Sequence, residues 1–121
     1  MATILIVDDE PWVAEKLKEL LPAHTLLCAY TVKEARALFR KQRRSIDAIL
    51  FDGYMDPSDP TPTTLRLIAE IRASLFDRPL IGISRDGEMR VKQINHGCTS
   101  AMSKTPMDRL VTHVAAQLAA N

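Results

Sequence analysis

Polar and charged residues stand at the ends of four apolar runs in this sequence. Asp8 and Asp9 follow "TILIV", and Asp52 follows "AILF". Ser84 ends "PLIGIS", and Lys104 ends "AMSK". If these runs are parallel strands of one sheet, all five side chains meet at the edge formed by the carboxyl ends of the strands. Ligands bind at that edge in open α/β sheets.

Together these residue types suit phosphoryl chemistry. Carboxylates crowded at one edge raise one another's pKa unless a cation neutralises them, and Mg²⁺ prefers such hard oxygen ligands. A lysine ammonium and a serine hydroxyl can donate to phosphoryl oxygens, while a carboxylate can be the nucleophile that forms an acyl phosphate. Each residue alone also has a local explanation, because acids favour the starts of helices and turns, and a lysine can be a solvated charge.

The apolar runs predict strands that are buried on both faces, as in a parallel sheet covered by helices. The sequence contains five such runs, over residues 3–7, 26–30, 48–51, 78–84 and 100–103. A segment with apolar side chains every three or four residues follows each run, which is the pattern of a helix with one buried face.

Prolines, glycines and capping residues predict where these helices begin and end. The signals are, in chain order, Pro11 and Pro22 around the first helix, the basic cluster Lys41–Arg44 at the end of the second, Thr61 as cap and Pro62 as first residue of the third, Gly87 and Gly97 around the fourth, and a capping box over Thr105–Asp108 at the start of the fifth.

Five repeats of strand and helix predict an α/β fold with a doubly wound, five-stranded parallel sheet. We expect the (βα)5 flavodoxin-like strand order 2-1-3-4-5, with residues 1–121 forming a single domain. A chain of 121 residues is large enough to bury a core without metal or disulfide cross-links.

The composition argues against several classes of protein. Sixteen basic and fifteen acidic residues give a net charge of +1, which provides no field to attract nucleic acid or acidic membranes. Cys28 and Cys98 lack the spacing of a zinc site or a redox pair. There is no leader and no apolar run long enough to span a membrane, so we expect a cytoplasmic protein.

The whole sequence resembles the receiver domains of two-component response regulators, in particular chemotaxis-type single-domain receivers with no effector domain in the chain. The resemblance rests on "ILIVDDE", "DAILFDGYM", "PLIGIS" and the lysine of "AMSK", each at its expected strand end. It implies a Mg²⁺-dependent phosphoacceptor whose partners are a sensor histidine kinase or histidine phosphotransfer protein and a downstream protein of unknown identity. Its implied site consists of Asp52 as phosphoacceptor, Asp8, Asp9, Asp52 and the Tyr54 main-chain carbonyl as metal ligands, and Ser84 and Lys104 as partners of the phosphoryl oxygens.

The sequence departs from the receiver pattern at three places. Ala101 stands where receivers usually carry an aromatic residue on the fifth strand, and Thr105 separates Lys104 from the usual proline, so we expect the lysine to be aimed differently. The segment after Asp52 lacks the usual Pro-Gly turn and is a few residues longer. We also expect Lys104 to contribute little to the stability of the unmodified protein.

Three functions are therefore open. The first is a phosphoacceptor switch that catalyses only its own phosphorylation and dephosphorylation. The second is a receiver-like interaction module that binds partners without a phosphorylation cycle. The third is a small aspartyl-phosphate phosphatase, suggested by "FDGYMD" but disfavoured because such enzymes carry Asp-x-Asp and position 54 is Tyr.

Overall fold

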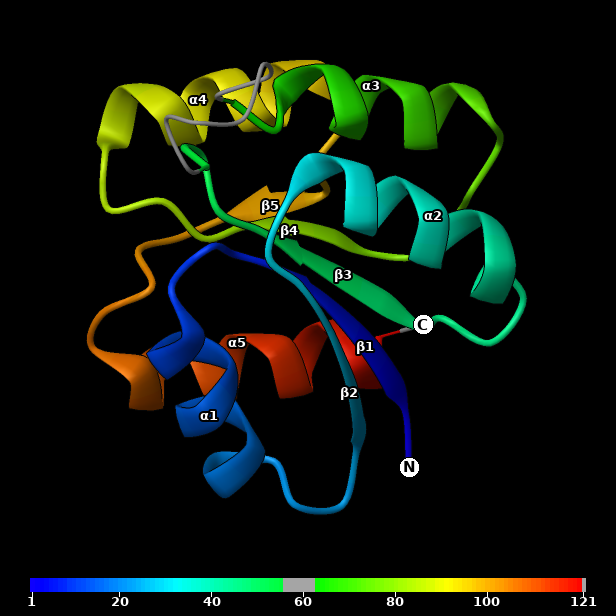
Figure 1. Ribbon diagram of the computed structural model, residues 1–121. Coiled ribbons are helices and arrows are strands. Elements are labelled where there is room, and N and C mark those ends of the chain that lie inside the picture. The colour runs from blue at the N-terminus through cyan, green and yellow to red at the C-terminus, as the bar shows by residue number, and fades with distance from the viewer. Residues whose placement is uncertain (56–62, 121) are drawn as a thin grey trace.

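Five parallel strands form the central sheet of the computed structural model, which describes residues 1–55 and 63–120 (Figure 1). Their order across the sheet is β2-β1-β3-β4-β5, and every neighbouring pair is parallel. This confirms the predicted doubly wound, flavodoxin-like α/β fold. The strands are β1 (Thr3–Val7), β2 (Thr25–Ala29), β3 (Ala48–Phe51), β4 (Leu80–Gly82) and β5 (Ser100–Ala101).

Helices cover both faces of this sheet. Figure 1 shows α2, α3 and α4 on one face and α1 and α5 on the other. The helices are α1 (Pro11–Leu20), α2 (Val32–Gln42), α3 (Leu65–Ala73), α4 (Gly87–His96) and α5 (Met107–Ala119).

The core explains why the central strands are apolar at every position. Alternate residues of a strand point to opposite faces, so Ile49 and Phe51 belong to the cluster under α2 and α3, whereas Leu50 belongs to the cluster under α1 and α5. All four residues of β3 are fully buried. A strand covered on both faces has no position at which a polar side chain reaches water, so the first polar side chain after it appears at its end.

The third helix begins later than predicted. Its first residue is Leu65, preceded by Thr64, whereas the predicted cap Thr61 and first residue Pro62 lie outside the described residues. The Thr64 side chain makes no capping hydrogen bond, because its hydroxyl donates to the Asp52 carbonyl at 2.6 Å. The start of α3 is thus tied to the end of β3.

The predicted capping box before α5 is wrong. The residue before the helix is Pro106, and no side chain caps it. The last two strands are also shorter than predicted, because β4 ends at Gly82 and β5 ends at Ala101. Ser84 and Lys104 consequently lie in the connections beyond the strands, where their side chains can turn toward the edge of the sheet.

None of the helices in the described part of the chain has both the length and the apolar character needed to cross a bilayer.

Candidate functional site

Two adjacent strands place the central carboxylates of the site. Asp8 directly follows β1, and Asp52 directly follows β3. Both backbones continue the sheet by one hydrogen bond: the Asp52 amide donates to the Val7 carbonyl at 2.8 Å, and the Asp8 amide donates to the Ala29 carbonyl at 3.1 Å. The two side chains therefore emerge side by side at the carboxyl edge of the sheet.

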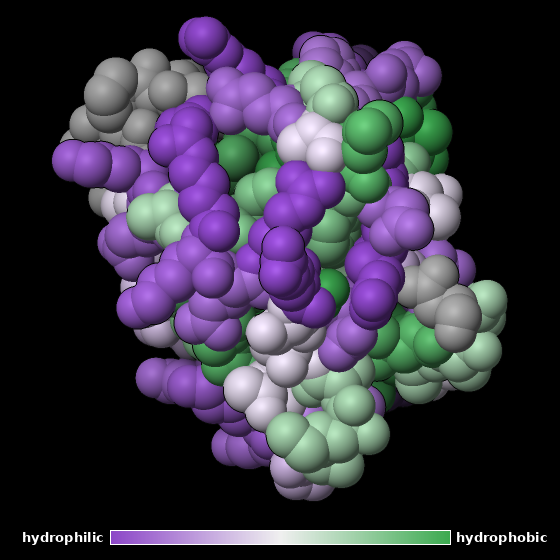
Figure 2. Space-filling model, turned by 90° about the vertical axis from the view of Figure 1, so that its right-hand side faces the viewer, coloured by the Kyte–Doolittle hydropathy of each residue, from purple (hydrophilic) through white to green (hydrophobic). Residues whose placement is uncertain are grey.

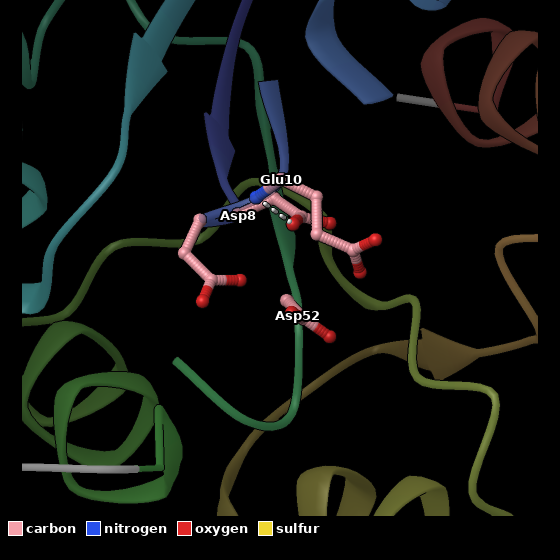
Figure 3. A group of neighbouring side chains, drawn as sticks. Asp8, Glu10 and Asp52 are labelled. Carbon is pink, nitrogen blue, oxygen red and sulfur yellow. Dashed lines mark hydrogen bonds between the residues drawn. The ribbon is translucent and has the colours of Figure 1, made fainter. Parts of the chain in front are cut away.

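Four acidic residues cluster at this edge. Asp8, Asp9, Glu10 and Asp52 each offer an oxygen, and these oxygens all lie within 4.8 Å of one another. Figure 3 shows Asp8, Glu10 and Asp52 coming from the neighbouring ends of the two strands, with the Glu10 amide donating to an Asp8 oxygen at 2.9 Å. Such a set of hard oxygen donors could hold a divalent cation.

Glu10 is the member of this cluster that the sequence prediction left out of the metal site. The signal was present, because Glu10 directly continues the acidic pair Asp8-Asp9. Asp8, Asp9 and Asp52 lie together as predicted. Tyr54 lines the cavity beside them, and the role of its carbonyl as a metal ligand remains a prediction.

Lys104 lies inside the acidic cluster rather than beside it. Its ammonium is 2.7 Å from an Asp8 oxygen, 3.1 Å from an Asp52 oxygen and 3.3 Å from a Glu10 oxygen, and its side chain is 2% exposed. The expectation that Thr105 aims the lysine differently is therefore wrong. A cis peptide bond joins Thr105 and Pro106, one residue beyond the lysine.

Burial and charge set the protonation of these groups. Burial, together with the charge of Asp8, raises the pKa of Asp52 from 3.8 to about 6, although Lys104 opposes the shift. Burial also raises the pKa of Asp8, although the hydrogen bond from Lys104 opposes this shift. Burial lowers the pKa of Lys104, but the hydrogen bond and charge of Asp8 and the charge of Asp52 outweigh it and raise the pKa overall. One ammonium thus does not neutralise this cluster.

The backbone around Asp52 is fixed by contacts that the sequence did not predict. The Gly53 amide donates to an Asp52 carboxylate oxygen at 2.8 Å, and Gln93, fully buried, donates through Nε2 to the Phe51 carbonyl at 2.9 Å. A Cβ at Gly53 would overlap Met89 Cγ, so any larger residue here would force the Met89 side chain of α4 to move. These roles depend on close packing between distant segments, and nothing in the local sequence pattern indicates them.

The other wall of the site is formed by the segments that follow β3 and β4. An open cavity of about 380 Å³ is lined by residues that include Asp52, Tyr54, Ser84 and Lys104. Ser84 is buried, and its hydroxyl accepts a hydrogen bond from the Asp86 amide at 3.1 Å. The Tyr54 hydroxyl donates to the Asp86 carboxylate at 2.9 Å, which joins the two segments across the mouth of the cavity.

Trp12 is 39% exposed and contacts two residues that line this cavity, Glu10 and Arg85. Its indole Nε1 donates to Glu10 at 2.7 Å, and the Arg85 guanidinium lies 5.5 Å from the centre of its ring. The hydrogen bond from Trp12 and the nearby charge of Lys104 lower the pKa of Glu10 despite an opposing effect of burial. Glu10 therefore connects the buried lysine to an exposed aromatic side chain.

Solved receiver domains superpose on this chain over nearly its whole length. The receiver domain of the Francisella response regulator 1452 is 21% identical, with a TM-score of 0.81, and the match covers 98% of this chain and 97% of that one. A response regulator receiver domain protein from Clostridium thermocellum is also 21% identical, with a TM-score of 0.82, over 98% of this chain and 94% of that one. NtrX from Brucella abortus is 25% identical, with a TM-score of 0.83, over 99% of this chain and 27% of that one.

No protein-family model matches the sequence, and no curated protein shows significant similarity to it. The structural matches nevertheless agree on the architecture over nearly the whole chain. This chain has the fold of the receiver domains of response regulators.

Proposed function

We propose that this chain is a phosphoacceptor switch in two-component signalling, with Asp52 as the residue that is phosphorylated. The observation that carries the proposal is the position of the Lys104 ammonium, 3.1 Å from Asp52 and 2.7 Å from Asp8 within an acidic cluster at the carboxyl edge of the sheet. A lysine ammonium in contact with two carboxylates can stabilise the additional negative charge when one of the carboxylates is phosphorylated.

The transfer uses a nucleophile that the fold already holds in place. A carboxylate oxygen of Asp52 attacks the phosphorus of a phosphohistidine, and a new P–O bond forms as the P–N bond breaks. The imidazole leaves with the electron pair of the broken bond and takes up a proton. Hydrogen bonds to the Asp52 carbonyl from Thr64 and to its carboxylate from Gly53 keep the nucleophile oriented.

The remaining polar groups of the site can stabilise the negative charge of the phosphoryl oxygens. Lys104 is an ammonium donor, and the Ser84 hydroxyl on the opposite wall of the cavity is a second donor, because accepting from the Asp86 amide leaves its proton free. Asp8, Asp9, Glu10 and Asp52 would hold Mg²⁺, which when bound neutralises carboxylate and phosphoryl oxygens and so supports the transfer. In the receiver pattern, the Tyr54 carbonyl completes this metal site.

The proposed partners are a sensor histidine kinase or a histidine phosphotransfer protein as phosphodonor, and a downstream protein that reads the phosphorylated state. The phosphatase alternative needs a carboxylate at position 54, where this chain has a tyrosine whose hydroxyl is bound to Asp86. A receiver-like module without a phosphorylation cycle is the outcome to which a negative result would point.

The test is the intact mass of the protein after treatment with phosphoramidate and Mg²⁺. Phosphoramidate carries the same P–N bond as phosphohistidine, so we expect one added phosphoryl group in the parent protein and none in Asp52→Asn. The matched control is Asp47→Asn, which changes an aspartate at the opposite end of β3 and should still be phosphorylated. Labelling of Asp52→Asn, or none of the parent, would refute the proposal.

A further inference from the structure

A groove between α2 and α3 lies apart from the acidic site and combines an apolar floor with basic walls. Its volume is about 310 Å³. The buried residues Phe39, Leu67 and Ile71 form its apolar floor, and its walls carry Arg36 and Arg40 of α2 and Arg43, which directly follows that helix. Figure 2 views this side of the molecule, where hydrophobic surface is visible between long hydrophilic side chains.

The charges around this groove are unequally paired. Glu70 is the only acidic side chain among the lining residues, and its two oxygens contact Arg36 at 3.0 Å and Arg66 at 3.4 Å. Arg43 donates to the hydroxyl of Ser74 at 2.6 Å. Arg40 is exposed and has no ion-pair partner among the described residues. The groove therefore keeps a positive charge, because Arg40 has no ion-pair partner among the described residues and Arg43 is bonded to the neutral Ser74.

A strained, exposed leucine stands next to this wall. Leu75 follows Ser74 directly, has a φ of +67° and is 86% exposed. The left-handed backbone region is unfavourable for a leucine, because its Cβ approaches the backbone carbonyl. Within the described chain no burial of the side chain compensates for that cost. Leu75 is the residue after the C-cap of α3, where a left-handed backbone is common, and its exposed side chain leaves apolar surface next to Ser74, which lines the groove.

We propose that the groove between α2 and α3 binds an acidic peptide segment of a partner protein, with an apolar side chain of the peptide on the floor and its carboxylates on Arg40 and Arg43. The groove has room for one or two large side chains, and Leu75 extends the apolar contact beyond its rim. Arginine forks suit carboxylates because they can donate two parallel hydrogen bonds. The proposal does not rest on phosphotransfer, because none of the groove residues belongs to the acidic cluster.

Two other kinds of partner fit this surface less well. A nucleic acid backbone requires several unpaired cations, whereas Arg36 is paired with Glu70, only Arg40 and Arg43 remain among the lining residues, and the whole chain carries a net charge of +1. A lipid surface favours a flat or convex apolar patch, whereas this apolar surface lies at the bottom of a groove.

The test is an amide NMR titration with the synthetic peptide acetyl-Glu-Asp-Glu-Leu-Phe-Asp-Glu-Asp-amide. We expect chemical-shift changes within residues 36–45 and 67–76, and none with a control peptide in which serine replaces Leu and Phe. Arg40→Glu should weaken binding about tenfold, because the change removes an ion pair and adds a repulsion. Lys41→Glu makes the same charge change on a residue that does not line the groove, and should weaken binding about twofold at most through long-range charge.

A further variant separates binding from folding. Leu75→Gly relieves the strained backbone, so the thermal midpoint should stay the same or rise while peptide affinity falls. The proposal is overturned if no shifts occur at millimolar peptide, if the serine peptide binds equally, or if Lys41→Glu weakens binding as much as Arg40→Glu. Tighter binding of polyuridylate or phosphatidylglycerol vesicles to the same residues would also overturn it, in favour of a nucleic acid or a membrane.

Discussion

The raised pKa of Asp52 predicts that this carboxylate destabilises the protein at neutral pH when no metal is bound. Its pKa rises from 3.8 to about 6 on folding, so ionising Asp52 costs about 3 kcal/mol more in the folded protein than in the unfolded chain. The side chain is only 9% exposed, so water screens little of this cost. The shift already includes the attraction of Lys104, which opposes it.

The sign of the pH dependence follows from the direction of the shift. Between pH 3.8 and about 6 the folded protein binds more protons at Asp52 than the unfolded chain does. The contribution of Asp52 to stability is therefore fully present below pH 3.8 and is lost as the pH rises through about 6. The Asp52→Asn variant has no carboxylate at this position to ionise, so its free energy of unfolding does not fall for this reason as the pH rises.

The assay is urea unfolding of the parent protein and of Asp52→Asn between about pH 4.5 and 7.5, with a chelator present. We expect Asp52→Asn to be up to about 3 kcal/mol more stable at pH 7.5, with the advantage shrinking steadily toward acid pH. Added Mg²⁺ should reduce the advantage, because it binds the protein that has all four carboxylates more tightly than the variant that has three. Asp77→Asn, on a side chain that is 93% exposed, controls for the loss of an aspartate as such.

The reasoning would be refuted by a difference between the two proteins that does not change with pH. It would also be refuted if Asp52→Asn were the less stable protein at pH 7.5 without metal. Either result would mean that Lys104 compensates the ionised carboxylate fully, and that a cation is not required to hold this site together.

Three further predictions concern the neighbours of Asp52. Lys104→Met should destabilise the metal-free protein by about 3 kcal/mol in urea unfolding, because it leaves buried carboxylates without their cation; an unchanged midpoint would restore the view of this lysine as a solvated charge. Trp12 is the only tryptophan, and its fluorescence should change as Mg²⁺ binds beside its partner Glu10; a Trp12 signal indifferent to Mg²⁺ would place the ion elsewhere. Tyr54→Phe removes the hydrogen bond to Asp86 across the cavity mouth and should speed hydrolysis of the phosphorylated protein two- to fivefold, an order of magnitude set by one exposed hydrogen bond, as followed by intact mass over time; equal lifetimes would show that this contact does not limit the access of water.

The sequence was sufficient to predict the fold and the meeting of Asp8, Asp9 and Asp52. Buried parallel strands need unbroken apolar runs, and the edge at which their ends meet follows from topology alone. The expectation that Lys104 adds little to stability assumed an exposed charge, which the structure contradicts, since the side chain is 2% exposed among carboxylates. Periodicity does not determine how far a side chain reaches back from a connecting segment.

The contacts that orient Asp52 could not be predicted because they join segments that are distant in the sequence. Thr64 stands at the position of a helix cap, yet its hydroxyl donates a hydrogen bond to the Asp52 carbonyl, 12 residues earlier in the chain. Gln93 lies in a helix that is expected to present polar residues to water, yet it is fully buried against the end of β3. Both roles arise only when α3 and α4 pack against the sheet, and the local sequence pattern does not predict that packing.

The connection after β4 is better placed than β5 to carry a change at Asp52 to the surface. Ala101 has only a methyl group, which offers little difference in contact energy between two states. By contrast, Ser84 is linked to the Asp86 amide, and Asp86 accepts hydrogen bonds from Tyr54 and from the amide of Glu88, where it caps α4. If the Ser84 side chain moves to reach a phosphoryl group, its oxygen shifts relative to the Asp86 amide, and the cap of α4 and its contact with Tyr54 readjust with it. If Asp52 is phosphorylated as proposed, we therefore expect a partner to read the state of the site at the exposed end of α4 rather than at the surface around Ala101.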